Sequence, residues 1–221
     1  MQENNFIYGK ILNAQELGYR NDEPGHAGRY FYISKLLTDF FPPLSDSIKN
    51  DHIILDVVPD DSSNVVFSNF VYHNDKIVEG KPGGRDEYRL YLNEENDHGR
   101  RYYEPGDIVL IQRLLDIDGP VYKFYKFSQK EKYTQYAKIR DLIEKYSETR
   151  LKTAAFLPQN EVTFLSLPKV NITNLDKPII TEDIKKAVFA EPVLLNNPQE
   201  NEITRRIRSA SFRDFVLLFY N

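Results

Sequence analysis

The chain has 221 residues, 41% hydrophobic and 28% charged, which gives room for one good-sized globular domain and a smaller one. Cysteine is absent, which excludes disulfides, a thiol nucleophile and thiolate-bound zinc or iron–sulfur clusters in these residues. The net charge of −4 argues against a nonspecific coat on a polyanion but is compatible with a local basic face. No apolar stretch approaches the ~20 residues that span a membrane, and the first residues lack a secretory pattern. We therefore expect a cytoplasmic protein without a membrane partner.

Residues 6–127 are expected to form mainly β structure. Runs rich in β-branched and aromatic residues alternate with turn sequences that contain Gly, Pro, Asn and Asp. Many short strands without alternating long helices predict a barrel or a sandwich. One short helix is expected at Ser34–Phe41, with Ser34 as its N-cap and two prolines after it. The seven expected strands are Phe6–Leu12, Arg29–Ile33, His52–Val58, Asn64–Tyr72, Glu87–Leu92, Asp107–Leu114 and Pro120–Phe127.

The sequence pattern changes after residue 128. Tyr136 and Ile143 belong to a set of apolar residues at helical spacing, which predicts an amphipathic helix over Gln129–Tyr146. We therefore expect two domains, a β domain at 1–128 and an α-rich linker or second domain at 129–221. The other elements expected in the second region are a strand at Glu161–Leu165, a helix at Thr181–Ala190, a linker at Pro192–Asn201 and a helix at Glu202–Asn221.

The most informative segment is 80–92, GKPGGRDEYRLYL, in which glycines bracket an arm of charged residues. Arginine presents a fork that matches guanine, and carboxylates such as Glu87 accept from cytosine. Lysines such as Lys81 are suited to holding phosphate. This combination is typical of reading DNA. A salt-bridge ladder on a solvent-exposed strand is the alternative for Arg85, Glu87 and Arg89.

The order of four segments, GHAGRYFYISKLLTDFFP, NVVFSNFVYHND, GKPGGRDEYRLYL and PGDIVLIQR, carries a family resemblance. It resembles the DNA-binding pseudobarrel of the EcoRII restriction endonuclease effector domain, a fold that also occurs in plant transcription factors. The resemblance covers Asn5–Phe127 and implies two arms, Asn13–Arg29 and Lys81–Arg89, that grip double-stranded DNA in its major groove. Departures from the family pattern are Gly83 and Gly84 within the second arm, and Tyr88 between its Glu and Arg. The expected DNA-binding residues are Tyr19, Arg20, Asn21, Asp22, Glu23, His26, Arg29, Lys35, Lys81, Arg85, Asp86, Glu87 and Arg89.

The last residues, ITRRIRSASFRDFVLLFYN, resemble the helix that leads into an HNH nuclease domain. The matching residues are Arg208, Phe212, Arg213, Val216, Leu217 and Tyr220. The resemblance implies that the chain is the target-recognition part of a type II restriction endonuclease. The catalytic histidine motif is not among these residues, so a nuclease domain with a divalent metal is expected beyond Asn221. We expect no cofactor in this chain, and leave open a homodimer of the full-length enzyme.

Two other functions remain open. Asp60, Glu79 and Lys81 satisfy the loose PD-(D/E)xK spacing of self-contained nucleases, in which two carboxylates bind magnesium and the lysine assists the attacking water. However, Lys81 runs directly into Pro82, whereas that motif sits within a core strand. The second alternative is a DNA-binding regulator without any nuclease. The four histidines are scattered without metal-ligand spacing.

Overall fold

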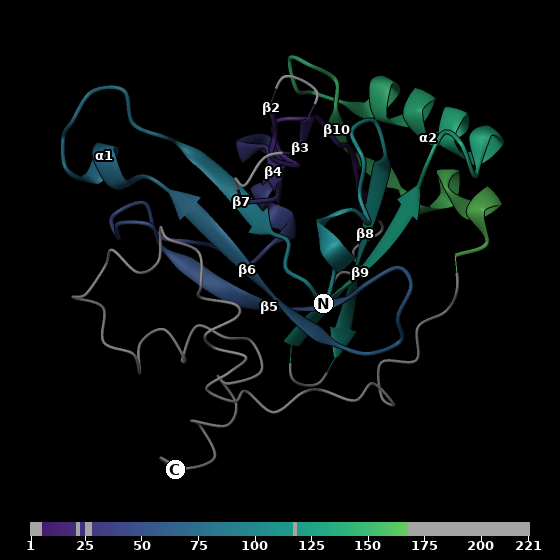
Figure 1. Ribbon diagram of the computed structural model, residues 1–221, viewed down its shortest axis with the longest axis horizontal. Helices are drawn as coiled ribbons and strands as arrows, with labels where there is room; N and C mark the ends of the chain where they lie inside the picture. The colour runs from purple at the N-terminus through teal and green to yellow at the C-terminus, as the bar shows by residue number, and fades with distance from the viewer. Residues whose placement is uncertain (1–5, 21–22, 25–27, 117–118, 168–221) are drawn as a thin grey trace, which may run out of the picture.

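The computed structural model describes residues 6–20, 23–24, 28–116 and 119–167. Its main feature is an eight-stranded sheet with the order β10-β1-β8-β9-β5-β6-β7-β4 (Figure 1). All neighbours in the sheet are antiparallel except β5 and β9. The strands are β1 (Phe6–Ile11), β4 (Tyr30–Ile33), β5 (His52–Val58), β6 (Val66–His73), β7 (Glu87–Tyr91), β8 (Ile108–Asp116), β9 (Gly119–Phe127) and β10 (Ala154–Pro158). A separate two-stranded ladder joins β2 (Tyr19–Arg20) to β3 (Glu23–Pro24).

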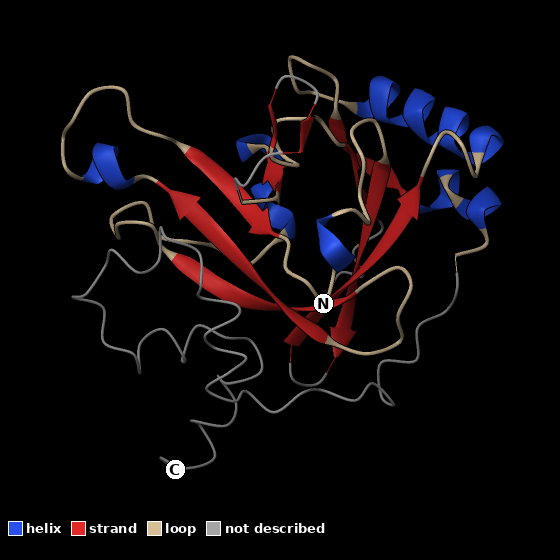
Figure 2. Ribbon diagram, viewed as in Figure 1, coloured by secondary structure: helices blue, strands red, loops and turns tan. Residues whose placement is uncertain are grey.

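The large sheet curls around one hydrophobic core (Figure 2). Tyr8 of β1, Phe31 of β4, Phe70 of β6 and Phe124 of β9 lie in the same buried cluster, although these strands are spread along the whole sheet. The two edge strands, β10 and β4, are not paired with each other, so the barrel is open. The mainly β fold class is confirmed, and so are all seven expected strands, with end shifts of one or two residues.

Short helices lie in the connections between the strands. The helix expected at Ser34–Phe41 is present as a 3₁₀ helix, η1 (Lys35–Phe40), and the Ser34 hydroxyl accepts from the Leu36 amide at 3.4 Å. Phe40 and Phe41 are buried against the aromatic core. Two further short helices were not expected: α1 (Asp75–Val78) and η2 (His98–Arg100).

The expected helix after residue 128 is confirmed as α2 (Tyr133–Tyr146). Its buried residues Tyr136, Ile139 and Ile143 form a second core with Ile7 and Leu157. Because β10 pairs with β1, the described part of the second region joins the first sheet. The division into domains at residue 128 stays a prediction, because residues 168–221, with both expected C-terminal helices, lie outside the described residues.

The strand expected at Glu161–Leu165 is wrong. The strand of this region is β10, which ends at Pro158, and two 3₁₀ turns follow, η3 (Gln159–Glu161) and η4 (Thr163–Leu165). Val162 and Leu165 are both buried in the second core. Their spacing of three residues suits a 3₁₀ turn, in which residues i and i+3 lie on one side. Within the described ranges, no helix has both the length and the apolar character needed to cross a membrane.

Candidate nucleic-acid interface

Two projections flank the β4–β7 pair of strands. Residues 12–29 connect β1 to β4 and include the β2–β3 ladder, while residues 74–86 connect β6 to β7 and include α1 (Figure 1). The strands are antiparallel, with Tyr30 opposite Tyr91 and Ile33 opposite Tyr88. The first projection therefore joins this pair at one end and the second at the other. At about 3.4 Å per residue, the two junctions are roughly 15 Å apart.

The second projection is anchored at its base by Asn74, which is fully buried. The Asn74 side-chain oxygen accepts from the Asn50 amide at 2.7 Å, and its nitrogen donates to the carbonyls of Asp46 and Ile48, both at 3.0 Å. The projection thus begins at residue 74, seven residues before the expected start at Lys81. Beyond this anchor the backbone takes left-handed conformations at Gly80 and Gly83, where glycine carries no steric cost.

The charges on this projection are unevenly paired. Glu79 accepts from Lys49 and, at 2.7 Å, from Lys81. These two ammonium groups, Lys49 first, lower the pKa of the Glu79 carboxyl to about 2. Lys76 makes only a 3.5 Å contact with the Gly83 carbonyl, and Arg85 is exposed. Neither Lys76 nor Arg85 forms an ion pair with another described residue, so both cations can bind an external anion.

Asp86 and Lys35 neutralise each other where the arm meets the sheet. Lys35 forms an ion pair with Asp86, and the Tyr72 hydroxyl donates to the same carboxylate at 2.6 Å. Both bonds lower the pKa of the Asp86 carboxyl, that from Lys35 most. The ring of Tyr72 stacks on Tyr88, with centroids 4.3 Å apart. This cluster fixes the start of β7. Because Lys35 and Asp86 are already paired with each other, they have less free hydrogen-bonding capacity for DNA than expected.

Arg89 lies between the two projections and is mostly buried. It forms an ion pair with Glu87, and its guanidinium carbon lies 4.0 Å from the centre of the Tyr30 ring. Its side chain is 14% exposed. Glu87 and Arg89 thus pair within one strand and are largely buried, which differs from the salt-bridge ladder on a solvent-exposed strand, and Arg85 forms no ion pair with a described residue.

The first projection presents Arg20, which is exposed on β2, while Tyr19 packs partly against the core. Arg20 stands opposite Glu23 in the two-stranded ladder. Asn21, Asp22 and His26 lie outside the described residues. Among the DNA-binding residues expected on the first projection, Arg20 is thus an exposed cation in the structure.

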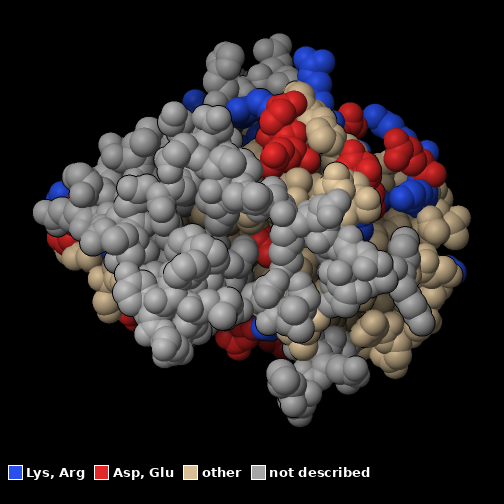
Figure 3. Space-filling view, turned by 90° about the horizontal axis from the view of Figure 1, so that it is seen from below, with Lys and Arg blue, Asp and Glu red and all other residues tan. Residues whose placement is uncertain are grey.

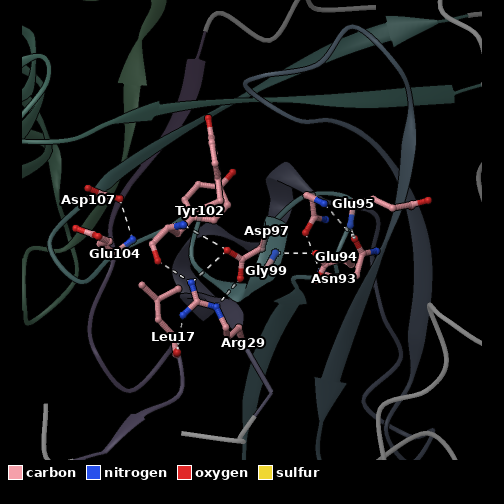
Figure 4. A network of polar contacts seen from close by, with 12 residues as sticks. Leu17, Arg29, Asn93, Glu94, Glu95, Asp97, Gly99, Tyr102, Glu104 and Asp107 are labelled. Carbon is pink, nitrogen blue, oxygen red and sulfur yellow. Dashed lines mark hydrogen bonds and ion pairs between the residues drawn. The ribbon is translucent and has the colours of Figure 1, made fainter. Parts of the chain in front are cut away.

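Arg29 is buried and stabilises the fold. It is 4% exposed, and its guanidinium binds both oxygens of Asp97, at 2.5 and 3.2 Å (Figure 4). It also donates to the carbonyls of Leu17 at 2.8 Å and Tyr103 at 2.6 Å. Because every side of this guanidinium is occupied within the protein, we leave Arg29 out of the proposed interface.

Asp60, Glu79 and Lys81 do not come together. Asp60 follows β5, whereas Glu79 and Lys81 follow β6, and these strands are antiparallel with Val57 opposite Val66. The three residues therefore lie at opposite ends of β6, which is eight residues long and so roughly 25 Å. The Asp60 carboxylate accepts from the Tyr102 hydroxyl at 3.1 Å. Among the described residues, no group of three or more His, Cys, Asp or Glu could hold a metal ion.

A pocket of about 380 Å³ lies at the base of the second projection. It was not expected from the sequence, because it combines residues 49–50 with residues 73–85, which begin more than twenty residues further along the chain. Its lining residues are Lys49, Asn50, His73, Asp75, Lys76, Gly83 and Arg85. Elsewhere on the described surface, acidic and basic side chains are interspersed on the face drawn in Figure 3. The lining of the pocket itself holds three cationic side chains and one carboxylate, on a chain whose net charge is −4.

Comparisons with known proteins leave the family open. No protein-family model matches the chain, and no curated protein matches it. A solved structure described as an Arabidopsis FUS3–DNA complex is similar to it, with 13% identity and a TM-score of 0.35, over 56% of this chain and 97% of that one.

Proposed function

We propose that the chain recognises a short site in double-stranded DNA, as the target-recognition part of a restriction endonuclease. The observation that carries the proposal is the pair of projections at opposite ends of β4 and β7, one of which holds two cations that have no ion-pair partner among the described residues. The two projections leave the sheet at points roughly 15 Å apart along the strands, a spacing of the same order as the ~12 Å width of the DNA major groove. The assignment to a restriction endonuclease depends on the resemblances found in the sequence.

Each kind of exposed side chain on the second projection has a role in this proposal. Arg85 is suited to a bidentate contact with guanine, and Lys76 to a phosphate. Ile77 and Val78 are 47% and 41% exposed, and apolar groups of this kind contact the methyl group of thymine. Arg20 on the first projection would hold the opposite side of the groove through a phosphate.

The proposal is tested by selecting bound duplexes from a randomised pool, methylated and unmethylated, with magnesium present. We expect one short motif to be enriched in uncut DNA. Failure to enrich any motif at moderate salt would contradict sequence-specific recognition. Cleaved ends in the recovered DNA would instead support a nuclease within this chain.

The selected motif then allows a test of the arm. Arg85→Gln removes the charged fork, and we expect it to reduce the preference for the motif over random DNA by roughly 5- to 100-fold, since one bidentate contact contributes about 1–3 kcal/mol. Arg150→Gln is the matched control, because Arg150 is exposed in the turn after α2 and belongs to neither projection. An equal loss of preference in both variants would remove Arg85 from base recognition.

A further inference from the structure

The pocket at the base of the second projection has the charge of an anion site. Three of its lining side chains are cations, Lys49, Lys76 and Arg85, and one is a carboxylate, Asp75. Lys49 is engaged with Glu79, which leaves Lys76 and Arg85 as cations without an ion-pair partner among the described residues. His73 adds no positive charge at neutral pH, because burial, with help from Arg89 and Arg85, lowers its pKa to about 3. Electrostatics in this pocket therefore favour a ligand with a negative group.

The pocket also offers a hydrogen-bond acceptor in its buried wall. Asn50 is 7% exposed, and its side-chain oxygen is buried without a hydrogen-bond partner. The Asn50 backbone has a φ of 50° and is fixed by the bond from its amide to Asn74. A buried polar atom without a partner costs free energy unless a ligand or water satisfies it. That oxygen has almost no accessible area, so a turn of the Asn50 side chain toward the pocket that it lines is needed to present this acceptor to a ligand with an N–H or O–H donor as well as an anionic group.

The volume of the pocket is large enough for a ligand bigger than a single small anion. About 380 Å³ falls within the range of small-molecule sites, roughly 300–1,000 Å³. A nucleotide combines the required features: a phosphate for cations, a base edge with amino or imino donors, and a size that fills such a pocket. Phosphate contacts by lysine and arginine are strong because the acceptor is charged.

We propose that this pocket binds one nucleotide, with its phosphate on Lys76 and its base edge against Asn50. The nucleotide has two sources, one displaced from the stack of a bound duplex or a free nucleoside monophosphate. The first source rests on the proposed DNA binding and the second does not. The two sources therefore allow failure of this inference to be told from failure of the proposed function.

The first experiment titrates the full chain with each of the four deoxynucleoside 5′-monophosphates, and with inorganic phosphate as the anion-only probe, by calorimetry. If the pocket takes a free nucleotide, at least one nucleotide should bind about tenfold or more tightly than phosphate. Lys76→Gln should weaken that binding about five- to tenfold, whereas the matched control Arg150→Gln should not change it. Urea unfolding of each variant checks that the fold is intact.

The second experiment places 2-aminopurine at each purine position of the selected duplex, because its fluorescence rises when the base leaves the stack. If the nucleotide comes from DNA, one position should brighten on binding, and Lys76→Gln should remove that rise while duplex binding persists. The inference is overturned if nucleotides bind no better than phosphate and no position brightens, or if Lys76→Gln changes neither signal. If no duplex binds at all, the proposed function fails. The nucleotide titration alone then determines whether the pocket binds a nucleotide.

Discussion

At the scale of single residues, Arg29 shows how a residue type typical of DNA contacts can serve the fold instead. Its guanidinium is buried with Asp97 and two backbone carbonyls, which join the segments around Leu17 and Tyr103 to the start of β4. A lysine has the same charge but lacks the planar fork that satisfies several acceptors at once. Sequence alone does not distinguish this arginine from Arg20, because both occur in the same polar, turn-rich segment.

We predict that Arg29→Lys lowers the free energy of unfolding by about 2–4 kcal/mol, because it leaves buried acceptors without their donors. Urea unfolding monitored by circular dichroism measures this change. The same substitution at exposed Arg20 is the control and should change stability by less than about 0.5 kcal/mol. Equal effects at the two positions would show that the Arg29 network contributes little to folding.

A second residue, His73, gives a prediction on pH. Its Nε2 lies 2.8 Å from the Tyr91 hydroxyl, and Glu87 stands opposite it on β7. Burial, followed by Arg89 and Arg85, lowers the pKa of His73 to about 3. The unfolded chain binds this proton near pH 6.5, so the stability that His73 contributes is present above pH 6.5. It is lost as pH falls toward 3, where the unfolded state binds more protons.

We expect His73→Gln, which can keep a bond to Tyr91, to flatten the pH dependence of the unfolding free energy between pH 6.5 and 4.5. The difference in slope should approach one proton, on the order of 1 kcal/mol per pH unit. Urea titrations at four pH values give this slope. If wild type and variant have the same slope, His73 is protonated in the folded protein over this range.

At the scale of elements, the strands follow from the sequence more closely than the short helices do. All seven expected strands are present. They are recognisable in the sequence because a strand with one face on the core needs apolar side chains at alternate positions, and β-branched and aromatic residues fill those positions here. The strand predicted at Glu161–Leu165 was wrong because a short apolar run that contains Val162 and Leu165 fits a strand or a 3₁₀ turn equally well. β10 was missed because Ala154 and Ala155 are weak strand formers. In this structure both are buried, Ala154 in the main core and Ala155 in the second core.

The candidate site could be predicted only in part. The charged residues of 80–89 mark the second projection, yet its base at Asn74 and its pocket depend on residues 46–50, which the fold brings next to it. No local pattern connects these segments. The one sequence signal is the pair Asn50-Asp51, since these residue types favour turns, and Asn50 does adopt a left-handed conformation in the structure.

Helix α2 gives a prediction at this scale, because it contributes much of the second core. Ile143 is fully buried and contacts the face formed by β1 and β10. Ile143→Ala should lower the unfolding free energy by about 2–5 kcal/mol, measured in urea. Asp141→Ala, an exposed position two residues away, serves as its control and should have little effect. A small effect of Ile143→Ala would mean that α2 is not an integral part of the barrel.

At the scale of the whole molecule, the net charge of −4 limits how DNA can be bound. A protein that covers a duplex with a broad basic face neutralises many phosphates, and its affinity falls steeply with salt. This chain instead offers four exposed cations on its two projections, Arg20, Lys76, Lys81 and Arg85. Its binding should therefore depend more on base contacts and less on released counterions.

We predict that the logarithm of the DNA association constant falls with the logarithm of salt concentration with a slope between about −2 and −4. Each neutralised phosphate contributes roughly −0.9 to this slope, and the projections supply at most four cations. Fluorescence anisotropy with the selected duplex, at five salt concentrations, measures the slope. Lys76→Gln should make it shallower by about one unit, while Arg150→Gln should leave it unchanged. A slope near −8 would require a basic surface outside the two projections, and would contradict the geometry proposed for this interface.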